Sequence, residues 1–400
     1  MRNGFLGALG LLMAMAIAFW GACAPSSSGG NHPADDDASP ADDDASPTDD
    51  DDNDTTPPAD DDGSPADDDN DDSSPADDDD NDDDSATDVF AVGLNGAIVH
   101  YDGASWSPMT SGTPNDLTGI WGNGGSDVFV VGYPSVVLHY DGSLWSTVAS
   151  IPDTEYGGLA CVWGTSPSDV FAAGYEGGQN GVILHYDGTA WLVQWTAGVS
   201  LGVSEIRGVW GIASTNDFVV GESSANNAAP FPPIVSGLVL DNKNGSWTEM
   251  NNTGSLGPLN AVWGTSQSDV FAVGWIPNST GNPGGNLIMH YDGLLWSNMP
   301  VPTDDTAFVA GIWGASSSDA FAVGADYEGG FVFRYDGSSW STATNAASGL
   351  YGIWGSSAAD VFAVGRDNDA GVILHYDGSS WTTTTAGLSN SLNAVWGVKR

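Results

Sequence analysis

Three short motifs return seven times between residues 88 and 400, always in the same order. A Trp-Gly pair preceded by Ile or Val begins at Trp121, Trp163, Trp210, Trp263, Trp313, Trp354 and Trp396. An Asp, usually followed by Val-Phe, stands at Asp88, Asp127, Asp169, Asp217, Asp269, Asp319 and Asp360. Tyr-Asp-Gly-x-x-Trp occurs six times, and a degraded copy, "LDNKNGSW", ends at Trp247. The period of roughly 40–50 residues is that of propeller blades.

Each unit is predicted to contain four short strands. In the third unit these are "LACVWG", "DVFAAG", "GVILHYDG" and "AWLVQW". Short runs rich in Val, Ile, Phe, Tyr and Trp, separated by Gly, Asp and Ser, are the pattern of antiparallel strands joined by tight turns. Four such strands repeated around an axis make a propeller, so the sequence predicts an all-β fold.

The two ends of the repeat array predict how the ring closes. The first unit begins at Asp88 without a Trp-Gly strand, and the chain ends with "LNAVWGVKR", which is a copy of that strand. We expect residues 392–397 to complete the first blade. A ring closed in this way leaves no open sheet edge around the disc. The prediction is therefore a seven-bladed β-propeller over residues 88–400, closed by the C-terminal strand.

The charge of the chain is concentrated before the repeats. The formal net charge is −46, and residues 31–87 contain 26 Asp and no Lys or Arg. Such a segment cannot bury enough apolar surface to offset the entropy of ordering, so residues 23–87 are predicted to be a disordered acidic tether. The tether is either an extended spacer or a weak Ca²⁺ binder, since carboxylates suit that ion. The acidity excludes nucleic acid as a partner.

The first 22 residues are predicted to be a secretory signal. Arg2 precedes a short apolar run, and "WGACAP" places Cys23 after small residues. The alternative is cleavage by ordinary signal peptidase at Ala22-x-Ala24, which would leave Pro25 next to the cut. With Cys23 lipidated, the protein is anchored in the bacterial envelope, at the outer membrane or the cell surface. Cys161 is then the remaining cysteine, expected to be a small buried thiol.

Several propeller families share parts of the repeat. "FAVG…ILHYDGSSW" resembles the kelch repeat, "YDGSSW" resembles the Asp-box of sialidase-type propellers, and "W…LNAVWG" is similar to tectonin-type lectins. The signal, the Asp-rich tether and the "WG…DVFAVG…HYDG" repeats together resemble secreted bacterial surface lipoproteins. The resemblance implies a propeller fold and a lipid anchor, and it does not separate a binding protein from an enzyme.

The connections between strands differ in a way that predicts a binding face. The first and third connections of each unit hardly change in length, whereas the second connection and those between units vary widely. In a four-stranded meander the two variable connections emerge on the same face, where loops on a rigid scaffold concentrate binding residues. The predicted ligand-binding residues are the aromatics outside the repeat: Tyr133, Tyr156, Tyr175, Phe231 and Trp275. For Trp275 the alternative is packing over its own loop.

Five histidines occupy one repeat position just before Tyr-Asp-Gly. They are His100, His139, His185, His290 and His375, and we expect Leu240 and Arg334 to replace them in the other two units. Equivalent positions in neighbouring blades lie too far apart to share a metal ion. A hydrogen bond within the blade, to an Asp such as Asp169, is the expected role, since buried polar side chains need partners.

The function predicted from these features is non-enzymatic binding. The partner is an extracellular or periplasmic protein or a glycan, and the protein is expected to be a monomer without a metal or another cofactor. The alternative is a carbohydrate-active enzyme, either sialidase-like or another glycoside hydrolase. A sialidase-like site needs clustered arginines, and the propeller offers Arg207, Arg334, Arg366 and Arg400 at non-equivalent positions. A glycoside hydrolase needs paired carboxylates, such as Asp326 with Glu328 or Asp367 with Asp369.

Overall fold

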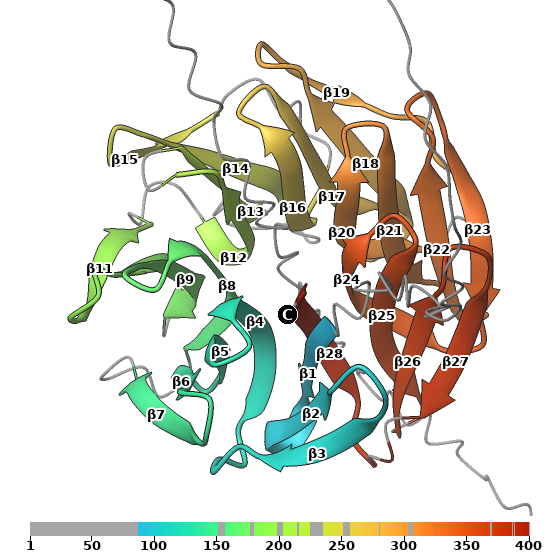
Figure 1. Cartoon of the computed structure of the whole chain (residues 1–400). Coiled ribbons are helices and arrows are strands. Elements are labelled where there is room, and N and C mark those ends of the chain that lie inside the picture. Colours follow the sequence, from blue (N-terminus) through green and yellow to red (C-terminus); the bar gives the residue numbers. More distant parts are fainter. Residues whose placement is uncertain are drawn as a thin grey trace, which may run out of the picture. The chain divides into compact units, whose positions relative to one another are not determined.

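The computed structural model describes residues 87–150, 157–176, 180–197, 203–213, 216–224, 235–250, 257–279, 281–302, 307–368, 370–385, 387 and 389–399. These residues form seven four-stranded antiparallel sheets, which are the blades of a propeller (Figure 1). The predicted signal peptide, Cys23 and the tether lie outside the described residues. None of the helices in the described ranges is long and apolar enough to span a membrane.

Blade 1 is built from both ends of the repeat array, and blades 2 to 4 follow in chain order. Blade 1 contains β28 (Leu392–Lys399), β1 (Thr87–Gly93), β2 (Ala97–Tyr101) and β3 (Trp106–Thr110), with the short 3₁₀ helix η1 (Leu94–Gly96) between β1 and β2. Blade 2 contains β4 (Asp116–Gly124), β5 (Asp127–Tyr133), β6 (Val136–Tyr140) and β7 (Trp145–Ser150). Blade 3 contains β8 (Gly158–Ser166), β9 (Asp169–Glu176), β10 (Asn180–Tyr186) and β11 (Trp191–Thr196). Blade 4 contains β12 (Val203–Gly211), β13 (Asp217–Ser224), β14 (Val235–Lys243) and β15 (Ser246–Glu249).

The remaining three blades repeat the same order of strands from the ring centre outward. Blade 5 contains β16 (Leu259–Ser266), β17 (Asp269–Pro277), β18 (Pro283–Tyr291) and β19 (Trp296–Asn298). Blade 6 contains β20 (Phe308–Ser316), β21 (Asp319–Ala325), β22 (Gly330–Tyr335) and β23 (Trp340–Ala346). Blade 7 contains β24 (Gly349–Ser357), β25 (Asp360–Asp367), β26 (Ala370–Tyr376) and β27 (Trp381–Thr385).

The C-terminal strand closes the ring, as the sequence predicted. Strand β28 pairs with β1 in antiparallel register, with Phe90 opposite Trp396. The innermost strands contact one another in the cyclic order β4, β8, β12, β16, β20, β24, β28 and back to β4. The all-β, seven-bladed fold is therefore confirmed (Figure 1).

The Trp-Gly pair joins neighbouring blades near the ring centre. The indole of one blade lies over the glycine of the next blade's pair, in the combinations Trp396–Gly122, Trp121–Gly164, Trp210–Gly264, Trp263–Gly314, Trp313–Gly355 and Trp354–Gly397. A Cβ on Gly355 would lie 2.7 Å from two ring carbons of Trp313. The motif needs glycine because any side chain there would occupy the space of the indole.

A second aromatic layer joins the blades farther out. The Phe of each second strand meets the Trp of the next blade's fourth strand edge to face, with ring centroids 6.0–6.4 Å apart. The pairs are Phe90–Trp145, Phe129–Trp191, Phe171–Trp247, Phe218–Trp296, Phe271–Trp340, Phe321–Trp381 and Phe362–Trp106. This geometry is favourable beyond the burial of apolar area. The repeat tryptophans are therefore packing residues.

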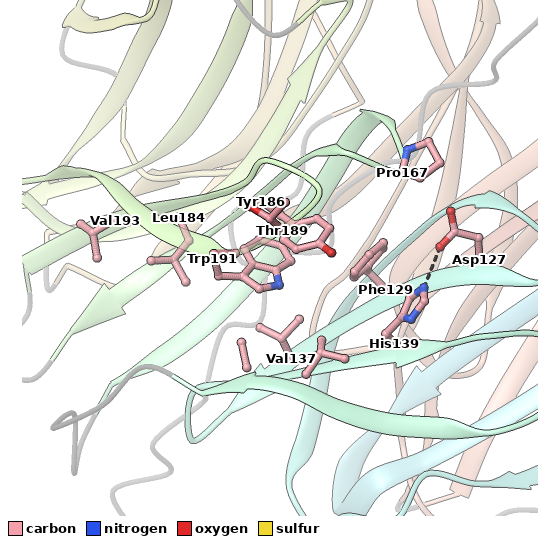
Figure 2. Close-up of a pocket in the computed structure, with 13 residues that line it drawn as sticks. Asp127, Phe129, Val137, His139, Pro167, Leu184, Tyr186, Thr189, Trp191 and Val193 are labelled. Atoms are coloured by element: carbon pink, nitrogen blue, oxygen red, sulfur yellow. Dashed lines mark hydrogen bonds and ion pairs between the residues drawn. The ribbon is translucent and has the colours of Figure 1, made fainter.

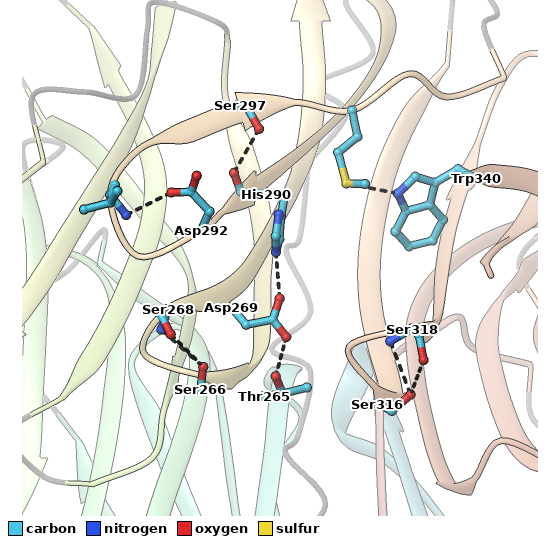
Figure 3. Close-up of polar contacts among 12 residues, drawn as sticks. Thr265, Ser266, Ser268, Asp269, His290, Asp292, Ser297, Ser316, Ser318 and Trp340 are labelled. Carbon is cyan, nitrogen blue, oxygen red and sulfur yellow. Dashed lines mark hydrogen bonds and ion pairs between the residues drawn. The ribbon is translucent and has the colours of Figure 1, made fainter. Parts of the chain in front are cut away.

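The predicted hydrogen bond of the repeat histidines is confirmed. His Nε2 lies 2.6–2.7 Å from the Asp that begins the second strand in His100–Asp88, His139–Asp127, His185–Asp169, His290–Asp269 and His375–Asp360. In blade 5 the other oxygen of Asp269 accepts a hydrogen bond from Thr265 (Figure 3). In blade 6 Arg334 takes the histidine position and binds both oxygens of Asp319, at 3.0 and 2.8 Å.

Blade 4 corrects one sequence assignment. Strand register places Asp241, and not Leu240, opposite Phe218, which is where the histidines lie in the other blades. Leu240 is buried in the core instead. Asp217 therefore lacks a cationic partner; it is 0% exposed and accepts a hydrogen bond from Asn242 at 3.0 Å. Burial raises the pKa of Asp217 to about 8.

Asp217 should make stability depend on pH. Its pKa is 3.8 in an unfolded chain and about 8 in the fold, so between these values only the folded state holds the proton. Stability from this group therefore falls as pH rises through that window. We expect Asp217→Asn to raise the free energy of unfolding at pH 7 by a few kcal/mol. The variant should also flatten the decrease of this free energy with rising pH. Urea unfolding from pH 5 to pH 8 measures both effects. Asp169→Asn, which removes the partner of His185, should destabilise instead, and an unchanged pH profile for Asp217→Asn would contradict the assignment.

Candidate functional site

The two faces of the ring are built differently. The turn face carries the connections from first to second and from third to fourth strands, and the variable face carries the connections from second to third strands and between blades. On the turn face, the Asp of each Asp-Gly turn accepts two backbone N–H groups, as Asp377 does from Ser379 and Ser380. The glycine that follows has a positive φ, 89° at Gly378. Because these turns are closely similar, the blades differ chemically on the variable face and in the space between blades.

Each inner strand contains a β-bulge near its variable-face end. The residue before the bulge pairs with the Gly that ends the next strand's core, as Leu117 does with Gly132. The extra residues of the seven strands are Thr118, Ala160, Arg207, Asn260, Ala310, Tyr351 and Asn393. Bulges re-aim side chains and are frequent next to active sites. One chemically variable position is thus repeated around the centre of the ring in a strand whose neighbouring positions hardly change.

Three of these bulged residues connect neighbouring blades. Thr118 donates to the Leu159 carbonyl at 2.6 Å, Asn260 to the Val309 carbonyl at 2.8 Å, and Asn393 to the Leu117 carbonyl at 2.8 Å. Each hydrogen bond joins the inner strand of one blade to that of the next. The role of these three residues is therefore structural.

Arg207 is the charged member of the bulge set. Its side chain is 6% exposed and binds Glu222 at 2.8 Å and Glu205 at 3.1 Å through Nη2, while Nη1 donates to Asn260 Oδ1 at 3.3 Å. Burial raises the pKa of the Glu205 carboxyl, and the attraction of Arg207 opposes that rise. A buried cation held by two acids is costly to desolvate, so such a group is a candidate functional residue.

Two predicted aromatic residues lie beside this ion-pair cluster. The ring of Tyr133 in blade 2 reaches Gly158 in blade 3, where a Cβ would lie 2.7 Å from a ring carbon. Gly158 pairs with Tyr175, which is half-buried. Burial raises the pKa of Tyr175, and the charge of Glu205 raises it further. Tyr133, Tyr175, Glu205, Arg207 and Glu222 therefore form one cluster across blades 2 to 4, which we name the variable-face cluster.

The other predicted ligand-binding residues do not join this cluster. Tyr156 and Phe231 lie outside the described residues. Trp275 lies in strand β17 opposite Asn286 and is 4% exposed, so the expectation of a loop aromatic on the surface is wrong. Its backbone N–H donates to the Pro258 carbonyl at 3.2 Å. The burial of Trp275 favours its alternative role in packing.

Sequence patterns did not identify Glu205 and Glu222 as candidate binding residues. Arg207 was noted in the sequence as one of four arginines at non-equivalent positions, and "IRGVWG" is the copy of the seven with a charged residue at the bulge position. Comparing the copies column by column would have singled it out. The two glutamates carry no such signal, because they lie in the poorly repeated ends of β12 and β13.

The enzyme alternatives find little support in the described residues. Arg334 lies at the turn-face end of blade 6 on Asp319, whereas Arg207 and Arg366 lie at the variable-face ends of blades 4 and 7. These three arginines therefore do not cluster. Asp326 caps its own turn by accepting the backbone N–H groups of Glu328 and Gly329. In the ranges that the structure describes, no group of three His, Cys, Asp or Glu side chains could hold a metal. Cys161 is buried, as expected, and its Sγ donates to the Ala173 carbonyl at 3.7 Å.

Comparison with known proteins shows the fold. No model of a known protein family matches the sequence, and no curated protein matches it. The chain is similar to the solved structure of YCF48 from Cyanidioschyzon merolae, with a TM-score of 0.51 and 18% identity over 72% of this chain and 90% of that one. It is also similar to YCF48 bound to D1 peptide, with a TM-score of 0.48 and 16% identity over 72% of this chain and 87% of the other. The SapL1 lectin in complex with alpha methyl fucoside gives a TM-score of 0.47 and 14% identity over 69% and 95% of the two chains. The likeness to YCF48 from Cyanidioschyzon merolae is one of fold alone.

Proposed function

We propose that this chain is a non-enzymatic binding propeller whose variable face holds a protein or glycan partner. The observation that carries the proposal is the variable-face cluster, in which Tyr175 lies near Glu205 and near Tyr133 of the neighbouring blade, and Glu205 and Glu222 hold the buried Arg207. Tyrosine rings with hydroxyl groups and a fixed charged group are typical of recognition surfaces. The propeller scaffold positions these residues on strand ends, so they lose little conformational freedom when a partner binds.

The proposal includes display at the bacterial envelope. The support for it is in the sequence: a signal-like segment, Cys23 after small residues, and 26 Asp between residues 31 and 87. An acyl anchor at Cys23 with an extended tether would hold the ring away from the membrane. Cys23→Ser should then release the protein from the membrane fraction into the soluble fraction after cell lysis. Unchanged fractionation of this variant would remove the anchor from the proposal.

The variable-face cluster predicts which substitutions change binding. The purified protein is first probed with a glycan array and with envelope extracts to obtain a binder. Tyr175→Phe and Tyr133→Phe should weaken that binding about tenfold, because each variant removes a hydroxyl group and keeps the ring. Tyr175→Ala should cost at least about 2 kcal/mol of binding free energy, as a recognition aromatic does. Dissociation constants by biolayer interferometry measure both effects.

The matched control lies on the opposite face. Leu294 is 81% exposed in the Asp-Gly turn of blade 5, and Leu294→Ala should change neither binding nor the melting temperature. Binding that is lost in Leu294→Ala and retained in Tyr175→Ala would place the partner on the turn face. Turnover of an array glycan would favour the carbohydrate-active enzyme.

A further inference from the structure

The seven gaps between neighbouring blades differ in the residue at one position of the outer strand, which we call the filler. The filler is the residue three places after the repeat Trp on each outer strand. These residues are Met109, Val148, Gln194, Met250, Met299, Ala343 and Thr384. Gln194 Oε1 accepts a hydrogen bond from Trp247 Nε1 at 2.9 Å, and Met299 Sδ lies 3.5 Å from Trp340 Nε1 (Figure 3). The filler therefore touches the next blade directly.

The length of the filler decides whether the next Trp is covered. Where the filler is Met or Gln, the facing tryptophans are buried: Trp145 is 7% exposed, Trp247 9%, Trp296 5% and Trp340 5%. Where the filler is Val148, Ala343 or Thr384, the facing tryptophans Trp191, Trp381 and Trp106 are only partly buried. Three gaps are thus left without the side chain that closes the other four.

The gap between blades 2 and 3 contains a cavity of about 780 Å³. Its walls are Val137 and Val148 of blade 2 and Leu184, Trp191 and Val193 of blade 3 (Figure 2). Val148 and Val193 are 46% and 58% exposed, so the cavity is open to solvent. This volume is within the range of about 300–1,000 Å³ that is typical of ligand pockets.

The turn-face end of this cavity has a carboxylate oxygen without a partner. Asp127 Oδ1 binds His139 at 2.7 Å (Figure 2). In blades 3, 5 and 7 the second oxygen of the equivalent Asp accepts a hydrogen bond from the residue four places earlier, which is Thr165, Thr265 or Ser356. Blade 2 has Asn123 at that place, and among the described residues nothing binds Asp127 Oδ2. This oxygen is available to a cation in the cavity.

Blade 6 shows that an Asp at the start of a second strand can bind a guanidinium group, here from the residue that replaces the histidine. In blade 6 the guanidinium of Arg334 binds both oxygens of Asp319 and lies 5.0 Å from the centre of the Phe321 ring. After residue 87 the chain carries 27 acidic and six basic residues, so its charge favours a basic partner. An arginine also has the unbranched stem that the apolar walls accept from Met or Gln in the closed gaps.

We propose that the gap between blades 2 and 3 binds an arginine-bearing segment of a partner polypeptide. The guanidinium binds Asp127 Oδ2, and the stem lies along Val137, Val148 and Leu184. This site opens beside the turns of Pro167 and Thr189. It is therefore separate from the variable-face cluster, and neither proposal depends on the other.

The test uses the full chain and the probe acetyl-Gly-Ser-Arg-Ser-Gly-amide. Methyl NMR should show the signals of Val137, Leu184 and Val193 shifting as the peptide is added. Val148→Met supplies the filler of blades 1, 4 and 5, and should weaken binding about tenfold or more. Asn123→Thr supplies the hydroxyl that occupies the second oxygen in blades 3 and 5, and should weaken binding several-fold. Replacing the arginine by citrulline, which keeps the shape and removes the charge, should weaken binding about tenfold.

Both variants keep the acidic tether. A loss of peptide binding in these variants therefore reports on the cavity and not on general attraction between the acidic chain and the basic peptide. Both substitutions copy residues already present in sister blades, and unchanged melting temperatures check that the ring is intact. Weakening by Val148→Met and Asn123→Thr together with the methyl shifts supports the proposal. Equal binding by wild type and Val148→Met, or equal binding of the arginine and citrulline peptides, overturns it. A glycan that binds here and is lost in Val148→Met, with no binding of the arginine peptide, also overturns it.

Discussion

Removal of residues 391–400 should destabilise the ring so strongly that the cooperative unfolding transition at its normal melting temperature disappears. Strand β28 contributes Leu392, Ala394, Val395 and Trp396, which are 0–3% exposed, and its whole ladder with β1. Burial of a large apolar side chain contributes about 1.5–3 kcal/mol. The total loss approaches the whole stability of an ordinary domain, about 5–15 kcal/mol. The deletion also exposes the backbone edge of β1, so we expect aggregation.

Differential scanning calorimetry and light scattering measure this effect. The control is deletion of residues 31–80, which the sequence predicts to be part of a tether and which should leave the melting temperature unchanged. A protein without residues 391–400 that melts like the full chain would show that β28 is not needed to hold the ring together.

Trp263→Ala should destabilise the ring by roughly 3–5 kcal/mol. The indole is 3% exposed and lies over Gly314 of the next blade, so truncation leaves a cavity between two blades. Gly314→Val should have an effect of similar size for the opposite reason, since the new side chain needs the space that the indole fills. Urea unfolding monitored by circular dichroism gives both free energies.

Two comparisons make this prediction specific. Leu294→Ala, at a position 81% exposed, should change the free energy of unfolding by no more than about 0.5 kcal/mol. Trp275→Ala should resemble Trp263→Ala, because Trp275 is buried although its sequence context indicated a surface loop. A double variant, Trp263→Ala with Gly314→Val, that is more stable than either single variant would confirm that the two sites share one space. Purely additive losses would contradict that contact.

The fold could be predicted well from the sequence because the residues that recur in the repeat are the ones that pack within and between blades. A residue that returns in every unit must satisfy the same contact seven times, and Trp-Gly, Phe-Trp and Asp-His each correspond to one observed contact between or within blades. The orphan strand at the chain end was equally informative, because a ring needs its missing strand from somewhere. The error at Leu240 has the same origin: blade 4 has lost the His-Tyr letters, so counting along the sequence missed the register by one residue.

The candidate site was less predictable because it consists of departures from the repeat. Tyr133 and Tyr175 were identified as aromatics outside the pattern, and they do lie together. Trp275 satisfied the same criterion and is buried, because the sequence does not show that β17 continues to Pro277 and pairs with a long third strand. The open gap between blades 2 and 3 was missed for a different reason. Val148 is an unremarkable residue in a strand, and its shortness matters only beside Trp191 of another blade.

The position of β1 within its sheet also determines how the ring carries a mechanical load. The strand order β28-β1-β2-β3 makes the N-terminal strand an interior one, hydrogen-bonded along both sides. A pull on the chain before Thr87 is directed along β1, so two ladders resist it in shear and must break together. An edge strand under the same pull would instead detach one hydrogen bond at a time. A propeller held by its N-terminal end can therefore bear tension from a bound partner through the same pairing that closes its ring.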